Sequence, residues 1–162
     1  MGTKGKEIVG AGAKEIIGLL NKALADEWLA QYQYWVGSLI VHGPMRPDVQ
    51  EELREHEKDE HKHANLLAER IIQLGGRPIT HIKDLEKMAN CPYDEPANDH
   101  VLKILAQNIE GEQCAIKVYS DMLKRLMELK DPVTYHIIRS ILQDELGHEQ
   151  DLQDLEADIK AI

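Results

Sequence analysis

The sequence contains no apolar run that approaches the roughly 18–20 residues needed to cross a bilayer. Its start, MGTKGKEIVGAGAKEIIGLL, also lacks the continuous apolar segment of a signal peptide, and Asn21 and Lys22 interrupt the apolar residues around them. We therefore expect a cytoplasmic protein that makes no membrane contact.

Cysteine is scarce as well, since Cys91 and Cys114 are the only two. Two cysteines exclude a disulfide framework and a four-cysteine zinc or rubredoxin site. From the residues alone, two interpretations stay open. Either Cys114 is a small buried apolar residue and Cys91 a loop thiol, or the two form a redox-active pair.

Basic residues are outnumbered, with 19 Lys and Arg against 29 Asp and Glu and a net charge of −10. This balance opposes nucleic acid as a main partner and favours cations. The one basic segment is a Gly-rich tail with Lys4, Lys6 and Lys14. We expect residues 1–12 to be a flexible end, and leave open whether this tail associates with DNA.

Strand-like alternation is rare, whereas apolar residues recur at intervals of three and four. This pattern predicts four long helices, at about 13–41, 48–74, 99–130 and 132–159. Asp48 after Pro47 and Asp131 before Pro132 are expected N-caps.

The predicted helices pair through two short turns and one long connection. The 22 residues of 77–98, at about 3.3 Å each, can cross the whole bundle, with one helical turn near 82–88. We therefore expect a single domain over 1–162, all-α, forming a four-helix bundle with one long crossover.

Each predicted helix places one Glu within its apolar stripe, where an unpaired carboxylate costs several kcal/mol or becomes neutral. Two of these acids lie in Glu-x-x-His motifs. In each predicted hairpin the two acids lie 33 residues apart in the sequence. Adding 85 to the residue numbers of four groups in the first hairpin gives the same four residue types in the second. Glu27, Tyr34, Glu60 and His63 become Glu112, Tyr119, Glu145 and His148. Two hairpins with the same four groups are what a duplication would leave.

Four carboxylates at one level of a bundle would repel one another strongly unless cations lay between them. Their charge offsets two divalent metal ions, and oxygen-rich ligation with one imidazole per ion favours iron, with manganese as the alternative. A Glu from each of two helices and Glu-x-x-His from the other two is a di-iron carboxylate arrangement. The competing interpretation places these groups on solvated helix faces. The predicted ligands are Glu27, Glu60, His63, Glu112, Glu145 and His148.

The segment LNKALADEWLAQYQY resembles the first helix of bacterioferritins, and the chain resembles the ferritin superfamily over nearly its whole length. The resemblance implies two iron ions per subunit, bridged by Glu60 and Glu145. It makes Glu27, His63, Glu112 and His148 terminal ligands. Glu110 competes with Glu112 by proximity, but it lies off the apolar stripe and breaks the 33-residue spacing.

Three departures refine the resemblance. His61 stands where bacterioferritins have a haem-ligating Met, so no haem is expected. No fifth helix is expected, unlike in 24-subunit ferritins. DNA-protection-during-starvation (Dps) proteins also lack one and form 12-subunit shells, although their iron site lies between subunits. An intrasubunit site with Cys91 and Cys114 resembles the Dps-like thioferritin branch, which implies a 12-subunit homo-oligomer and a redox-active cysteine pair.

The resemblance implies a ferroxidase that oxidises Fe(II) with hydrogen peroxide or O₂ and mineralises Fe(III) inside a hollow shell, protecting against oxidative stress. The alternative is a non-storing di-iron or di-manganese peroxidase or catalase of rubrerythrin type. A DNA-compacting protein is a third hypothesis, which the net charge opposes. Tyr34 and Tyr119 are expected to bond ligand carboxylates, and either could donate an electron. His56 either lines an iron entry path or is a satisfied core histidine. The metal in vivo, the oxidant and a Cys91–Cys114 bond are left open.

Overall fold

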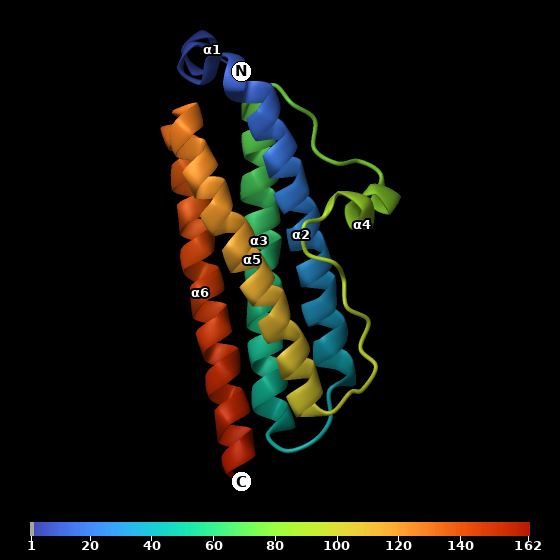
Figure 1. The fold of residues 1–162 in the computed structure, drawn as a ribbon. Coiled ribbons are helices and arrows are strands. Elements are labelled where there is room, and N and C mark those ends of the chain that lie inside the picture. Colours follow the sequence, from blue (N-terminus) through green and yellow to red (C-terminus); the bar gives the residue numbers. More distant parts are fainter. Residues whose placement is uncertain (1) are drawn as a thin grey trace.

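Four long helices lie side by side in the computed structural model, which describes residues 2–162 (Figure 1). They are α2 (Ala13–Ile40), α3 (Arg46–Gln73), α5 (Val101–Leu129) and α6 (Pro132–Ala161). Short turns join α2 to α3 and α5 to α6, so each pair is an antiparallel hairpin. The predicted all-α four-helix bundle is confirmed.

The connection between α3 and α5 runs along the outside of α2 from one end of the bundle to the other (Figure 1). It contains a 3-10 turn at Ile82–Asp84 followed by the single-turn helix α4 (Leu85–Met88). The long crossover and the helical turn within it were both predicted. Because the crossover returns the chain to the far end, α3 and α5 point in the same direction.

The helix ends show where local sequence signals were sufficient. Asp131 caps α6 as predicted, accepting hydrogen bonds from the backbone nitrogens of Val133 and Thr134 at 3.1 Å. The helix α3 was predicted to begin near Asp48 and begins at Arg46, so the prediction that Asp48 is its N-cap is wrong. The N-cap is Met45, which adopts a left-handed conformation at φ 54°. Pro47 lies in the first turn, where its missing N–H has no intrahelical partner to lose.

The N-terminal segment, for which a flexible end was expected over residues 1–12, has regular secondary structure. It contains the helix α1 (Thr3–Val9) and a 3-10 turn at Gly10–Gly12, and Val9 is buried against the end of the bundle. Met1, which belongs to the expected tail, lies outside the described residues. Within 2–162, α6 is the last helix, and no helix has the length and hydropathy to cross a membrane.

The apolar stripes pack into two core clusters. The first contains Leu20, Leu24, Leu67, Ile71, Leu126 and Ile138, and the second contains Val41, Leu53, Ile104, Leu105, Leu152 and Ile159. In each helix the predicted Glu falls between the residues of these clusters along the chain. The acids are therefore enclosed by apolar packing on both sides, where water cannot solvate them.

Candidate metal centre

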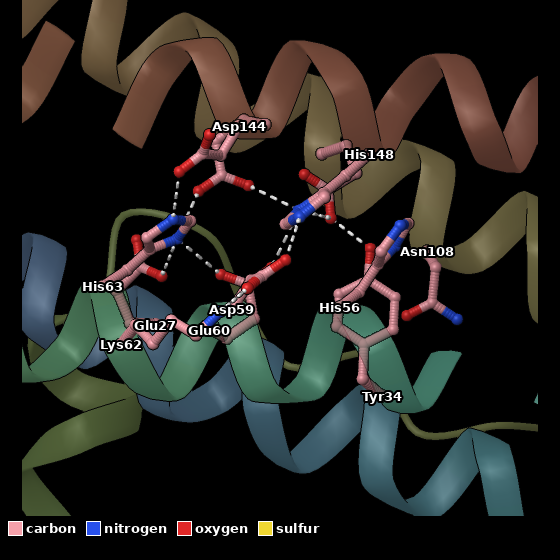
Figure 2. Close-up of polar contacts among 12 residues, drawn as sticks. Glu27, Tyr34, His56, Asp59, Glu60, Lys62, His63, Asn108, Asp144 and His148 are labelled. Atoms are coloured by element: carbon pink, nitrogen blue, oxygen red, sulfur yellow. Dashed lines mark hydrogen bonds and ion pairs between the residues drawn. The ribbon is translucent and has the colours of Figure 1, made fainter. Parts of the chain in front are cut away.

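The six predicted ligands meet inside the bundle, and none has more than 5% of its surface exposed (Figure 2). Their ligand atoms form two groups, each with all atoms within 4.8 Å of one another. One group is Glu27, Glu60, His63 and Glu145, and the other is Glu60, Glu112, Glu145 and His148. The groups share Glu60 and Glu145, so the cluster has two adjacent positions with two carboxylates between them.

Glu60 and Glu145 each offer one oxygen to each position. The Nδ1 atom of His63 lies 3.2 Å from Glu60 Oε2 and 3.1 Å from Glu145 Oε1. The Nδ1 atom of His148 lies 3.3 Å from Glu60 Oε1 and 3.4 Å from Glu145 Oε2. Each of these carboxylates thus reaches both positions, which is the geometry that a bridging ligand needs.

Glu27 and Glu112 each serve one position only. Glu27 Oε2 lies 3.4 Å from His63 Nδ1, and Glu112 Oε1 lies 3.9 Å from His148 Nδ1. Glu110, the competitor of Glu112, is exposed on the other side of α5. The stripe register predicted for α5 is therefore the one the structure has.

Two tyrosines hold the outer carboxylates from the opposite hairpin. The hydroxyl of Tyr34 on α2 donates to Glu112 on α5, and the hydroxyl of Tyr119 on α5 donates to Glu27 on α2. Both hydrogen bonds were predicted and are confirmed. Because each bond crosses between hairpins, the pair fixes the spacing of the two halves at the level of the site.

Two further acids contact the histidines, and our sequence reasoning missed both. Asp144 Oδ2 lies 3.1 Å from Nε2 of His63, and Asp59 Oδ2 lies 3.6 Å from Nε2 of His148 (Figure 2). A carboxylate on the outward nitrogen fixes the tautomer and orients the ring of a metal-binding histidine. The sequence could have revealed both acids, because each motif reads Asp-Glu-x-x-His and residues 59 and 144 are also 85 positions apart.

The electrostatics of the cluster call for positive charge. Burial, together with the carboxylates of Glu60 and Glu145, raises the pKa of Glu27 and of Glu112 well above the usual range. Burial acts to lower the pKa of His148, but the carboxylates of Glu145 and Glu60 prevail and raise it to about 10. Without metal, protons therefore collect where cations would otherwise lie, and metal binding must displace them.

The hydrogen-bonding pattern leaves room for those cations. One oxygen of each of the four glutamates and Nδ1 of His148 are buried and lack a hydrogen-bond partner within 2–162. Buried polar atoms are rarely left in this state in folded proteins. Four carboxylates and two imidazoles form a donor set suited to iron or manganese, and two such ions would satisfy the unpartnered atoms.

His56 lies on α3, one turn before Glu60, with 2% of its surface exposed. Its ring stacks on that of His148 with centroids 4.0 Å apart, and neither ring nitrogen has a hydrogen-bond partner in the described chain. Its Nε2 also lies 2.9 Å from Glu52 Oε1, and both interpretations offered from the sequence stay predictions.

Cys91 and Cys114 are joined by a disulfide that ties the crossover to α5. Asp26, which neither motif nor spacing identified, holds the crossover here. Its carboxylate accepts from the backbone nitrogens of Asn90 at 2.6 Å and of Cys91 at 2.8 Å. A cavity of about 40 Å³ lies between Cys91 and the carboxylates of Glu27 and Glu112. The disulfide therefore lies beside the centre, as the sequence led us to expect of the cysteines.

Comparisons with known proteins agree with the fold. A solved dodecameric thioferritin, the bacterioferritin-related protein from Bacteroides fragilis, is 42% identical, with a TM-score of 0.94 over 99% of this chain and 96% of that one. A DNA protection during starvation protein from Pyrococcus furiosus is 29% identical, covering 92% of this chain and 80% of its own length. A bacterioferritin from Rhodobacter capsulatus is 28% identical, over 85% of this chain and 80% of its own length.

The family comparison covers most of the molecule. The model of the ferritin-like domain matches residues 17–162, which include all four long helices except the first turn of α2. The match therefore spans both hairpins, the crossover and all six clustered residues. The chain belongs to the ferritin family.

Proposed function

We propose that this protein is a di-iron ferroxidase that stores iron and protects against oxidative stress. The observation that carries the proposal is the pair of four-residue groups that share Glu60 and Glu145. Glu60 and Glu145 would hold both iron ions, with Glu27 and His63 completing one position and Glu112 and His148 completing the other.

The reaction uses Fe(II) as its substrate. Two Fe(II) ions give up one electron each, so that hydrogen peroxide and two protons yield two water molecules and two Fe(III). With O₂ as the oxidant, the same two electrons and two protons yield hydrogen peroxide. Because both electrons leave adjacent ions, the oxidant is not reduced by one electron to a radical. The 40 Å³ cavity beside Glu27 and Glu112 has room for a molecule of this size.

The chain's own residues prepare the site for this reaction. Asp144 accepts from Nε2 of His63, and Asp59 lies 3.6 Å from Nε2 of His148, which leaves each Nδ1 facing the metal position. Tyr34 and Tyr119 hold Glu112 and Glu27 in place, and either phenol would give one electron to the oxidant and one proton to the bonded carboxylate. We also propose that the Cys91–Cys114 pair is redox-active, since two electrons and two protons convert its disulfide into two thiols.

We further propose a closed shell of 12 subunits in the cytoplasm, the assembly named for the thioferritin from Bacteroides fragilis. The outer face of α2 supports association, because it presents four large apolar side chains. Their exposed fractions are 40% for Trp28, 52% for Tyr32, 46% for Trp35 and 52% for Leu39. An apolar stripe of this kind is typical of a surface that another subunit covers.

The test is anaerobic loading with Fe(II), followed by stopped-flow mixing with hydrogen peroxide or O₂. We expect rapid oxidation with two Fe(II) consumed per peroxide, and continued iron uptake into a particle of twelve times the chain mass by light scattering. A monomer or dimer that oxidises iron but holds only two ions per chain would instead favour the non-storing peroxidase. A shift of DNA mobility at low salt would favour the DNA-compacting alternative.

A further inference from the structure

A second group of metal-ligand side chains lies next to the centre but outside it. Glu52 and His56 on α3 and Asp151 on α6 bring one ligand atom each within 4.8 Å of one another. None of them is among the six residues of the di-iron centre. Asp151 is exposed, Glu52 is half-buried and His56 is buried, so the group leads from the surface into the bundle.

His56 is the side chain that distinguishes this group from an ordinary acidic patch. Its Nε2 lies 2.9 Å from Glu52 Oε1, but the orientation is not that of a hydrogen bond, and no other partner is found within the described residues. A 98% buried imidazole that makes no hydrogen bond is costly. A divalent cation held by imidazole and two carboxylates would satisfy it and would also relieve the repulsion between Glu52 and Asp151.

His56 also belongs to an inner group. Its ligand atom lies within 4.8 Å of ligand atoms of Glu112 and His148, which form one side of the di-iron centre. Figure 2 shows His56 beside His148, with Tyr34 and Asn108 close by. A single imidazole thus separates the outer group from the nearer metal position.

The group of Glu52, His56 and Asp151 has no counterpart at the positions related to it by the 85-residue repeat. Its presence is therefore not explained by the duplication. Adding 85 to 52 and 56 gives Ile137 and Ile141, and subtracting 85 from 151 gives Leu66. All three equivalents are apolar, and Ile141 is fully buried in the first core cluster. The polar route therefore exists on the His148 side and is closed by apolar packing on the His63 side.

We propose that Glu52, His56 and Asp151 form a third divalent-cation site, through which ions pass between the surface and the di-iron centre. The binding site stands on these three residues alone, whereas the transfer role rests on the proposed function. Fe(II) is the expected ion in the cell, and Co(II) is a suitable probe because it accepts the same imidazole and carboxylate donors without being oxidised by air.

The location is tested by anomalous diffraction at the cobalt edge, on crystals of the assembled protein soaked in Co(II). The wild type should show a peak between Glu52, His56 and Asp151 in addition to the peaks of the inner centre. Glu52→Gln and Asp151→Asn should lose the outer peak and keep the inner ones. Glu55→Gln, which removes the same charge from an exposed position of α3, is the control and should keep all peaks.

The outcomes separate the two proposals. Inner peaks without an outer peak in the wild type would overturn the third site and leave the proposed function intact. Absence of the inner peaks would overturn the proposed function. The transfer role is tested by the rate at which limiting Co(II) fills the inner centre, followed by its visible absorption. We expect Glu52→Gln to slow filling at least about tenfold, and an unchanged rate would overturn transfer.

Discussion

The α2–α3 hairpin and the α5–α6 hairpin carry the same chemistry in different surroundings. Five residues of the buried cluster and its direct contacts have an identical counterpart 85 positions later, namely Glu27, Tyr34, Asp59, Glu60 and His63. Around them the halves differ, because His56 corresponds to Ile141, Asp26 to Gly111, and Cys114 to Leu29. The arrangement of the clustered carboxylates and histidines is thus shared between the halves, whereas the group of Glu52, His56 and Asp151 and the Cys91–Cys114 disulfide each occur once, without a duplicated counterpart.

The two proposed metal positions therefore have different surroundings. The position of His148 lies next to the unpartnered His56, whereas the position of His63 is enclosed on the corresponding side by apolar Ile141. An ion that enters by way of His56 would reach the His148 position first. Substitutions of the clustered carboxylates that both halves share should have the largest effects on Fe(II) oxidation. Substitutions of surrounding residues that occur in one half only should have the smallest.

Removing a residue common to both positions should have the largest effect. Glu60→Ala or Glu145→Ala removes an oxygen ligand from both metal positions at once, so rapid Fe(II) oxidation should fall by more than about a hundredfold. The fold should survive, because Ala favours helix and the change relieves carboxylate repulsion. Stopped-flow spectroscopy measures the rate, and circular dichroism checks the fold. Oxidation at the wild-type rate in either variant would contradict the assignment.

Removing a residue of one position should have a smaller but clear effect. Glu112→Ala should slow oxidation at least about tenfold, because it strips the His148 position of its own carboxylate. Glu110→Ala is the matched control, since it removes an exposed carboxylate two residues away on the same helix. The two variants are compared by initial rates under saturating Fe(II). Equal losses in both would show that the register of α5 is not what places the ligand.

The outer acids should modulate binding rather than abolish it. Asp144→Asn should weaken metal affinity by about tenfold or more, because it loosens the contact that orients His63. Asp59→Asn should have a smaller effect, since its oxygen lies 3.6 Å from the histidine nitrogen and that of Asp144 lies 3.1 Å away. Calorimetric titration with Co(II) measures both affinities. The reverse order would mean that the outer contacts do not set ring orientation.

The mildest change is expected in the surroundings that only one half possesses. Asp26→Asn weakens the bonds that hold Asn90 and Cys91, which should cost about 1–2 kcal/mol of stability. Metal affinity should stay the same, because Asp26 is not one of the clustered ligands. Denaturant unfolding compares this variant with Asp84→Asn, a control in the same crossover whose partner is exposed Lys87. A large loss of metal affinity would place Asp26 in the centre itself.

Much of this architecture could be predicted from the sequence, because its signals are periodic or repeated. The apolar spacing defined the helices, and the 33- and 85-residue intervals selected Glu112 over Glu110 before any contact was known. Asp59 and Asp144 were missed although the same interval relates them, since we did not expect charged residues beside the motif to be part of it.

Other features had no periodic signal to reveal them. Asp26 acts by accepting bonds from a loop more than sixty residues away, and only the folded crossover brings the two together. The group of Glu52, His56 and Asp151 likewise joins two helices far apart in sequence. The start of α3 also had no periodic signal. The helix begins at Arg46, upstream of Asp48, after Met45 in a left-handed conformation.

The assignment of six residues to two iron ions, with Glu60 and Glu145 shared, can be tested by locating the ions themselves. The experiment is anomalous diffraction at the iron edge, on crystals loaded anaerobically with Fe(II). We expect two iron peaks about 3.5–4 Å apart. Each should lie against Nδ1 of one histidine, His63 or His148, with the carboxylates of Glu60 and Glu145 spanning both. A single peak, or iron bound away from these carboxylates, would contradict the assignment.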